Sequence, residues 1–169
     1  YKSDIVKQYF KLMHKDLKIK FIKINNFSKK GSGLSLTLNK SKKYLDKPFI
    51  FCPCDTIFRD KINFNTNNNI IFFNKKISNR YRTLYTDKNN NLKKISLKKN
   101  NNKKKYIGLA FIKDYKVFWN NNKLTKKTTE LGEVERINYM LKSGKKFKVK
   151  KIKYWLDIGE KNYLKKEIN

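Results

Sequence analysis

Cysteine, proline, glycine and acidic residues are all scarce in this chain of 169 residues. It has two cysteines, two prolines and six glycines, and only 13 acidic residues against 43 lysines and arginines. Cys52 and Cys54 are separated by a single residue, so a disulfide between them would be strained, and the spacing does not fit a metal site. We expect both thiols to be buried and reduced, as in a cytoplasmic protein.

Long apolar runs are also missing. No stretch is long enough to cross a bilayer, and no signal-peptide pattern opens the chain. Hydrophobic residues make up 38% of the chain, which is enough for one domain with a real core, so we treat residues 1–169 as a single domain. Because the chain starts at Tyr1 and not at a methionine, we expect that an amino-terminal piece is missing.

The net charge of +30 has two interpretations. A basic protein with many aromatic residues is typical of a nucleic-acid binder. However, the lysines are spread along the chain, and over-used lysine, asparagine, isoleucine, phenylalanine and tyrosine all share A/T-rich codons, which indicates compositional bias. The aromatic residues fall mainly within buried-strand patterns, and no RNA-binding signature appears. We therefore favour compositional bias over nucleic-acid binding, and a modest preference for anionic substrates fits either interpretation.

The hydrophobic pattern predicts an α/β domain with a mixed sheet. An alternating strand over 18–24, a helix after a glycine loop and a buried strand ending at Asp55 would form a right-handed βαβ unit. The other predicted elements are a helix over 4–13, a buried strand over 70–73, paired strands around a turn at 87–91, an exposed loop over 98–105, a buried strand over 106–112, a short helix over 113–119, a helix from 132 capped by Gly144, and an alternating strand over 146–155.

Two acidic residues occur in the same kind of sequence context. Asp55 and Asp157 each follow an apolar or aromatic strand and precede a turn. Open α/β sheets bind their ligands at the carboxyl ends of strands. Two carboxylates at adjacent strand ends suit a magnesium ion that bridges phosphates, because hard cations take oxygen ligands. Taken alone, either acid is better explained as a cap or turn residue.

Four segments together resemble the sugar-phosphate nucleotidyltransferases, a family that includes glucose-phosphate thymidylyltransferases and mannose-phosphate guanylyltransferases. In the family's order they are GSGLSLTLNKSKKYLDKPFIFCPCDTIF, YIGLAFIKDYKVFW, GEVERINYMLKSG and YWLDIG. The resemblance implies a Rossmann-like nucleotide-diphospho-sugar transferase fold with a mixed, mostly parallel sheet that lacks its amino-terminal strand and loop. It also implies a reaction, in which a sugar phosphate attacks the α-phosphorus of a nucleoside triphosphate and pyrophosphate leaves.

The resemblance assigns roles to individual residues. Asp55 and Asp157 would be catalytic and would hold Mg²⁺. Gly33 would bring the backbone close to the base or ribose, and Gly108 would do the same against the sugar. Glu133 would accept hydrogen bonds from sugar hydroxyls. Two of these residues also have structural explanations, since Gly108 is typical of a bulge and Glu133 suits the amino-terminal end of a helix.

Two basic residues are weaker candidates. Lys98 lies near the position where the family has a lysine for the sugar phosphate, although the local match is poor and a solvated lysine explains it as well. Arg82 is a candidate from this sequence only.

The chain departs from the family in two respects. It has no glycine-rich loop with an arginine and a later Lys-Pro, which in the family cradles the triphosphate, so we expect the chain to be inactive alone. CPCDTIF also carries a single acid, Asp55, where many members have another polar residue. The alternatives are a non-catalytic relative with a binding or regulatory role and a nucleic-acid-binding domain. By analogy, the enzyme would supply nucleotide sugars for a surface polysaccharide, while the base, the acceptor (a sugar or another phosphorylated alcohol such as phosphocholine) and the oligomeric state stay open.

Overall fold

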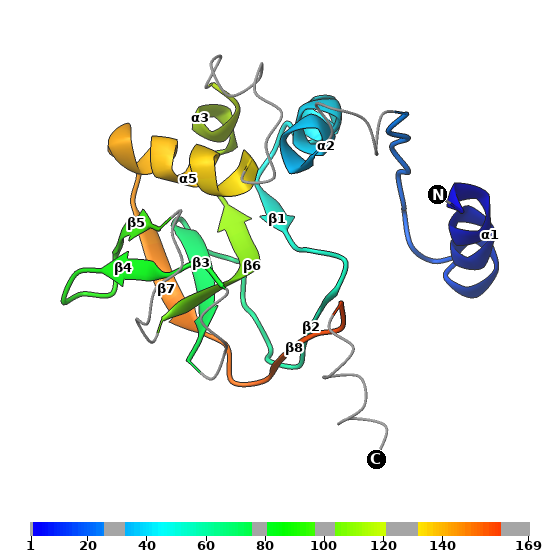
Figure 1. The fold of residues 1–169 in the computed structure, drawn as a ribbon. Coiled ribbons are helices and arrows are strands. Elements are labelled where there is room, and N and C mark those ends of the chain that lie inside the picture. The colour runs from blue at the N-terminus through cyan, green and yellow to red at the C-terminus, as the bar shows by residue number, and fades with distance from the viewer. Residues whose placement is uncertain (1, 26–32, 76–80, 97–103, 121–131, 160–169) are drawn as a thin grey trace.

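The computed structural model describes residues 2–25, 33–75, 81–96, 104–120 and 132–159 (Figure 1). The helices are α1 (Ser3–Met13), α2 (Leu34–Ser41), the short 3₁₀-helix η1 (Lys42–Tyr44), α3 (Tyr115–Trp119) and α5 (Gly132–Lys142). The strands are β1 (Phe49–Phe51), β2 (Thr56–Phe58), β3 (Asn69–Asn74), β4 (Leu84–Thr86), β5 (Leu92–Ile95), β6 (Lys105–Ile112), β7 (Phe147–Lys151) and β8 (Trp155–Asp157). Within these ranges no helix has the length and apolar character needed to span a membrane.

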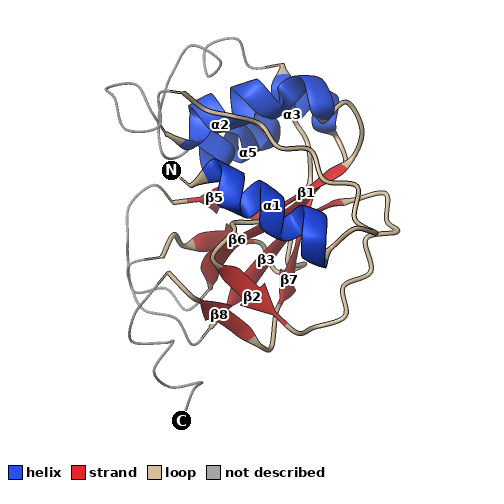
Figure 2. Cartoon of the chain, turned by 90° about the vertical axis from the view of Figure 1, so that its right-hand side faces the viewer, coloured by secondary structure: helices blue, strands red, loops and turns tan. Residues whose placement is uncertain are grey.

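A four-stranded sheet in the order β1-β6-β3-β7 forms the centre of the fold. Strand β6 runs antiparallel to both of its neighbours, whereas β3 and β7 are parallel. Strands β1, β3 and β7 therefore point the same way and β6 opposes them, which confirms the predicted mixed, mostly parallel sheet. Helices α2, α3 and α5 lie together on one side of this sheet, as the two views show (Figure 1, Figure 2).

The two central strands divide the core into two layers. Every residue of β3 is buried, as is nearly all of β6, which agrees with their uninterrupted apolar sequences. On one face of β6, Tyr106, Ala110 and Ile112 belong to a cluster that includes side chains of α2, α3 and α5. On the other face, Ile107 and Leu109 belong to a second cluster that extends toward β2 and β8. Strand β6 therefore links the two cores.

Two small antiparallel ladders accompany the sheet. Strands β4 and β5 form the predicted pair, and the Asp87 carboxylate accepts hydrogen bonds from the backbone N–H groups of Asn89 and Asn91 in the turn between them. Strands β2 and β8 pair at the end of the molecule opposite α2, α3 and α5 (Figure 2). The predicted helix over 132–142 is also confirmed, and Gly144 follows it with a φ of 79°.

The segment before α2 differs from the prediction. Residues 18–24 form no strand, and no strand in the described ranges pairs with them. An alternating sequence becomes a strand only where a neighbouring edge satisfies its backbone hydrogen bonds. Here Ile19 and Phe21 are 39% and 37% exposed, and α1, although it forms over the predicted residues, buries none of its side chains. The predicted βαβ unit was therefore wrong.

Two further predictions of burial were wrong. Strand β1 ends at Phe51, so Cys52 and Cys54 lie in the following connection, where both are free but exposed. Lys105, which we assigned to an exposed loop, is instead the buried first residue of β6, and its Nζ donates a hydrogen bond to Thr83 Oγ1 at 3.2 Å. Of the rest of that loop prediction, residues 98–103 fall outside the described ranges.

Gly108 generates a prediction about stability. Its φ is +79°, and a Cβ at this position would overlap Cγ of Pro53 and lie 3.1 Å from its Cδ. Gly144 has the same φ, but a Cβ there would meet nothing within 4 Å. We expect Gly144→Ala to lower the free energy of unfolding by about 1 kcal/mol through backbone strain, and Gly108→Ala to cost about 1–3 kcal/mol more through overpacking.

Urea unfolding of the two variants measures this difference, with Gly144→Ala as the matched control. Adding Pro53→Ala to Gly108→Ala removes the obstructing ring atoms, so the double variant should recover part of the loss. Equal losses in Gly108→Ala and Gly144→Ala would show that the Pro53 contact does not constrain this position.

Candidate functional site

The pairing of β2 with β8 brings the two predicted acids together. In this antiparallel ladder Thr56 lies opposite Asp157, and Asp55 immediately precedes Thr56. The backbone N–H of Ile158 donates to the Asp55 carbonyl at 2.8 Å, so the ladder continues past the end of both strands. Two residues far apart in the sequence are thus held on adjacent backbones at the same end of the ladder.

The positions around Gly159 limit the distance between the two carboxylates. A Cβ placed on Gly159 would lie 3.1 Å from Asp157 Oδ1 and 3.3 Å from Asp55 Oδ2. These two oxygens are therefore at most 3.1 + 3.3 = 6.4 Å apart. Two ligands of one Mg²⁺ ion, each bonded at about 2.0–2.1 Å, lie at most about 4.2 Å apart. No third His, Cys, Asp or Glu joins them within the described part of the chain.

The donor set suits magnesium. This ion is commonly held by one or two carboxylates, with water and substrate phosphates completing its octahedron, and it does not require a cage built entirely from protein. Gly159 contributes by lacking a side chain, because any Cβ there would be crowded by both carboxylates. Its backbone N–H donates to Asp157 Oδ1 at 3.0 Å and orients that carboxylate.

Two residues that the sequence analysis overlooked support Asp157. The Tyr81 hydroxyl donates a hydrogen bond to Asp157 Oδ2, and the Tyr81 ring meets Trp155 edge to face, with centroids 5.3 Å apart. The Asp60 carboxylate accepts from the backbone N–H groups of Lys153 and Tyr154, both at 3.0 Å, and these bonds lower the pKa of Asp60. No local pattern marks Tyr81 or Asp60, since each acts on residues more than 70 positions away in the sequence.

Glu133 lies in the first turn of α5 and is only 8% exposed. Its Oε2 atom is buried and has no hydrogen-bond partner among the described residues. Burial raises the pKa of Glu133 to about 7, although backbone hydrogen bonds and the positive charge of Arg82 act in the opposite direction. Glu133 therefore occupies the amino-terminal end of its helix, as the structural explanation predicted, and Arg82 lies close enough to affect its charge.

The predicted glycines lie at positions where a side chain would be disfavoured, either by the backbone conformation or by a neighbouring segment of the chain. Gly33 precedes α2 with a φ of 144°. A Cβ on Gly132 would lie 2.8 Å from Cα of Ser35, so the first turn of α5 packs directly against the first turn of α2. Gly108 lies where the register of β6 against β3 shifts, and Pro53 packs against it. The bulge interpretation of Gly108 is therefore confirmed, while its contact with a sugar stays a prediction.

Two of the predicted site residues, Asp55 and Gly108, lie at the connection between β1 and β2, residues 52–55. Asp55 is the last residue of this connection, and after burial its negative charge is the next cause of the raised pKa of Cys52. Pro53 of the same connection contacts Gly108. Lys98 lies outside the described residues, so its predicted role is not addressed.

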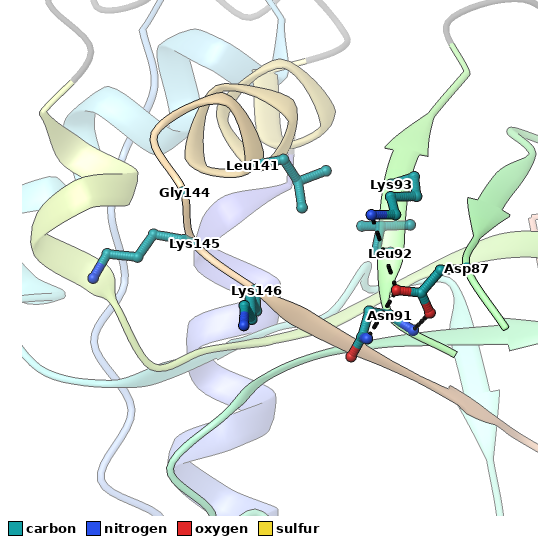
Figure 3. Close-up of a pocket in the computed structure, with 8 residues that line it drawn as sticks. All are labelled: Asp87, Asn91, Leu92, Lys93, Leu141, Gly144, Lys145 and Lys146. Atoms are coloured by element: carbon teal, nitrogen blue, oxygen red, sulfur yellow. Dashed lines mark hydrogen bonds and ion pairs between the residues drawn. The ribbon is translucent and has the colours of Figure 1, made fainter. Parts of the chain in front are cut away.

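A separate cavity of about 330 Å³ lies near the carboxyl-terminal end of α5 (Figure 3). It is lined by Asp87, Asn91, Leu92, Lys93, Leu141, Gly144, Lys145 and Lys146. Asp87 is engaged in its own turn, where it accepts from the Asn91 side chain at 2.9 Å and pairs with Lys93 at 4.0 Å. None of the predicted site residues lines this cavity.

Comparison with known proteins identifies the fold. No protein-family model matches the chain, and no curated protein matches it in sequence. Among solved structures, a protein described as a glucose-1-phosphate thymidylyltransferase from Bacillus anthracis superposes with a TM-score of 0.74 at 13% identity, covering 96% of this chain and 69% of that one. CTP:phosphocholine cytidylyltransferase from Streptococcus pneumoniae gives 0.72 at 12%, covering 96% and 73%.

A third structure, the inositol-1-phosphate CTP transferase from T. maritima, gives a TM-score of 0.70 at 12% identity and covers 99% of this chain and 70% of that one. At such low identity these likenesses establish the fold alone. The chain thus has a sugar-phosphate nucleotidyltransferase-like fold, as its sequence segments predicted.

The raised pKa of Glu133 predicts how stability depends on pH. Because the folded-state pKa of about 7 lies above the ordinary 4.5, the folded chain binds this proton more tightly than the unfolded chain does. Glu133 therefore contributes stability that is fully present below pH 4.5 and is lost as the pH rises through about 7, by roughly 3 kcal/mol at most.

Glu133→Gln should remove most of this decline. Glu135→Gln, a change in the same helical turn that removes only the last-ranked cause of the shift, should keep most of it. Urea unfolding at several pH values between 4.5 and 8 measures both. A wild-type chain and a Glu133→Gln variant with the same pH dependence would show that Glu133 is solvated in the folded state.

Proposed function

We propose that this chain acts in nucleotidyl transfer, in which a nucleoside monophosphate passes from a triphosphate to a sugar phosphate and pyrophosphate is released. The observation that carries the proposal is the convergence of Asp55 and Asp157 beside Gly159, at the end of the β2–β8 ladder. The likeness of the fold to nucleotidyltransferases of sugar phosphates, phosphocholine and inositol phosphate supports the same reaction class.

The reaction requires alignment and charge neutralisation and no protein nucleophile. A phosphate oxygen of the acceptor bonds to the α-phosphorus of the triphosphate as the bond to pyrophosphate breaks. Asp55 and Asp157 would hold Mg²⁺, which supplies positive charge to the reacting phosphates. Tyr81 and the Gly159 N–H hold the Asp157 carboxylate in position, so less ordering is needed when the ion binds.

The remaining residues would position the two substrates. Glu133 would accept hydrogen bonds from acceptor hydroxyls, and Arg82 would attract the phosphates nearby. Gly33, at the start of α2, would allow close approach of the base or ribose. Gly108 and Lys98 keep their predicted roles against the sugar and its phosphate. The chain contains no glycine-rich loop for the triphosphate, so we expect turnover only when a polypeptide that supplies one is present.

The described aromatic residues favour this reaction over nucleic-acid binding. A stacking platform needs exposed rings along a basic groove. Here the rings of Phe72, Phe118 and Phe147 are fully buried, and Tyr106 and Trp119 are nearly so, while the exposed rings come from separate segments of the chain: Tyr9, Phe21, Tyr44 and Tyr85. Free cysteines fit a reducing compartment, so we place the reaction in the cytoplasm, where it would supply nucleotide sugars for a surface polysaccharide.

Direct metal binding tests the role of the acid pair. We expect the chain to bind one Mn²⁺ ion, used as a paramagnetic substitute for Mg²⁺, and Asp55→Asn or Asp157→Asn to weaken this binding at least about tenfold, or about 1.4 kcal/mol. Asp16→Asn changes the net charge equally at an exposed position outside the β2–β8 ladder and serves as the control. Electron paramagnetic resonance of free Mn²⁺ gives the affinities.

The reaction class is tested by the binding of nucleotide sugars to the same chain. Isothermal titration calorimetry measures this binding with and without Mg²⁺. The proposal predicts binding that depends on Mg²⁺ and is lost in Asp157→Asn. If Asp16→Asn weakens Mn²⁺ binding as much as Asp157→Asn does, the ion is attracted by general charge, and the acid pair is not a metal site.

A further inference from the structure

Exposed apolar side chains are concentrated in α1 and in the segment that follows it. Twelve large hydrophobic side chains are exposed in the described part of the chain, and eight of them fall between residues 5 and 21. Leu12 and Met13 are the most exposed of these, at 68% and 66%. Single exposed apolar residues are normal on a protein surface, whereas a large apolar patch marks a surface that another molecule covers.

The apolar and polar residues of α1 lie on opposite faces of the helix. Ile5, Tyr9 and Leu12 recur at intervals of four and three residues, which places them on one face, and Lys7 and Lys11 lie on the other. No side chain of α1 is buried, and Figure 1 shows this helix apart from α3, α5 and the central sheet. An isolated helix of this length is marginal in water, because most helices gain their stability by packing such an apolar face.

The segment after α1 has the sequence of a strand without a strand partner. No backbone hydrogen bond joins residues 18–24 to another described residue. Side-chain contacts hold the segment in place, since Lys20 Nζ lies 5.1 Å from the centre of the Tyr44 ring and the rings of Phe10 and Phe21 are 6.1 Å apart. A row of unpaired backbone N–H and C=O groups is a template along which another extended chain can pair.

A cavity of about 430 Å³ lies between α1 and this segment. Its lining is apolar at Phe10, Leu17, Ile19 and Phe21 and basic at Lys11 and Lys15. Residues 2–25 contain seven lysines and only two aspartates, so the surface around the cavity is strongly positive. The cavity therefore suits an apolar side chain whose neighbours carry negative charge.

Three kinds of occupant differ in how well they fit this surface. A second copy of the chain would bring two strongly positive surfaces together, which disfavours self-association. An anionic lipid surface would cover the apolar side chains but offers no partners for the backbone groups of residues 18–24. An extended acidic polypeptide pairs with the backbone, covers the apolar side chains and neutralises the lysines, so it fits the surface best.

We propose that α1 and residues 18–24 form a docking surface for an acidic polypeptide segment, which binds in an extended conformation and adds a β-strand along residues 18–24. An apolar side chain of the bound segment fills the cavity, and its carboxylates pair with the surrounding lysines. This surface is separate from the β2–β8 ladder, so the inference does not depend on the proposed nucleotidyl transfer.

A labelled peptide tests the chemistry of the bound segment. The probe is a capped peptide as long as residues 18–24, in which glutamate alternates with valine and phenylalanine replaces the central valine. Fluorescence anisotropy at physiological ionic strength measures its binding to the full chain. We expect this peptide to bind at least about tenfold more tightly than the same peptide with lysine in place of glutamate, because like charges oppose each other there.

Proline variants of the chain test the backbone pairing. Ile22→Pro and Lys23→Pro each remove one N–H donor, and consecutive N–H groups of an extended chain point to opposite edges, so one of the two faces the bound segment. That variant should weaken binding of the glutamate peptide about tenfold. Ile22→Ala and Lys23→Ala keep the donor, serve as matched controls and should weaken binding by less than about threefold.

A substitution in the cavity tests the apolar contact. Leu17→Gln should weaken binding of the glutamate peptide about fivefold, because an apolar side chain of the peptide loses its contact there. Ile57→Gln changes an exposed apolar residue of β2 and should leave binding unchanged. Hydrogen exchange should show new protection of amides in residues 18–24 when the peptide is bound.

Several results would overturn the proposal. Equal binding of the glutamate and lysine peptides would show that charge does not select the bound segment, and unchanged binding in both proline variants would exclude strand pairing. Dimerisation of the free chain in analytical ultracentrifugation, lost in Leu17→Gln, would assign the surface to a second copy. Binding to phosphatidylserine vesicles that is tighter than binding to the peptide, and is lost in Leu17→Gln, would assign it to a membrane.

Discussion

The positions of the other elements depend on strand β6, because this strand is paired on both edges and buried on both faces. Its antiparallel pairing with β1 and β3 fixes the order of the sheet, and its two faces belong to the two separate cores. Gly108 interrupts this strand at a shift of register, where the missing side chain admits Pro53. The chain leaving β1 is thereby held against the sheet just before it reaches Asp55.

The acid pair depends on a second, smaller set of interactions. Strands β2 and β8 have three residues each, which is too few to hold a ladder without additional support. That support comes from Asp60, which binds the backbone ahead of β8, and from Tyr81, which joins Asp157 and Trp155. Two carboxylates in a chain of strongly positive charge are thus kept close together by side chains from other segments.

The buried polar side chains differ in how many of their hydrogen-bonding atoms have partners. Asn69 donates to Asp114 and to the Lys146 carbonyl and accepts from two backbone N–H groups, so its amide is fully used. Asn138 exchanges two hydrogen bonds with the backbone of Ile95. Such residues stabilise the fold. Glu133 Oε2 has no partner within the described ranges, and the same holds for the Tyr106 hydroxyl, Arg136 Nε and Trp155 Nε1. In the proposed function, hydroxyls of the acceptor would supply a partner for Glu133.

The sequence by itself determined the elements whose information is local. The uninterrupted apolar runs predicted β3 and β6, and the apolar spacing with Gly144 predicted α5, because burial and helix capping depend on neighbouring residues. The tertiary structure decided the rest. Residues 18–24 alternate like a strand but have no partner edge among the described residues, and the support of Asp157 by Tyr81 arises only when segments 76 residues apart meet. Pairing and orphaned polar atoms are properties of contacts across the fold, which no local pattern specifies.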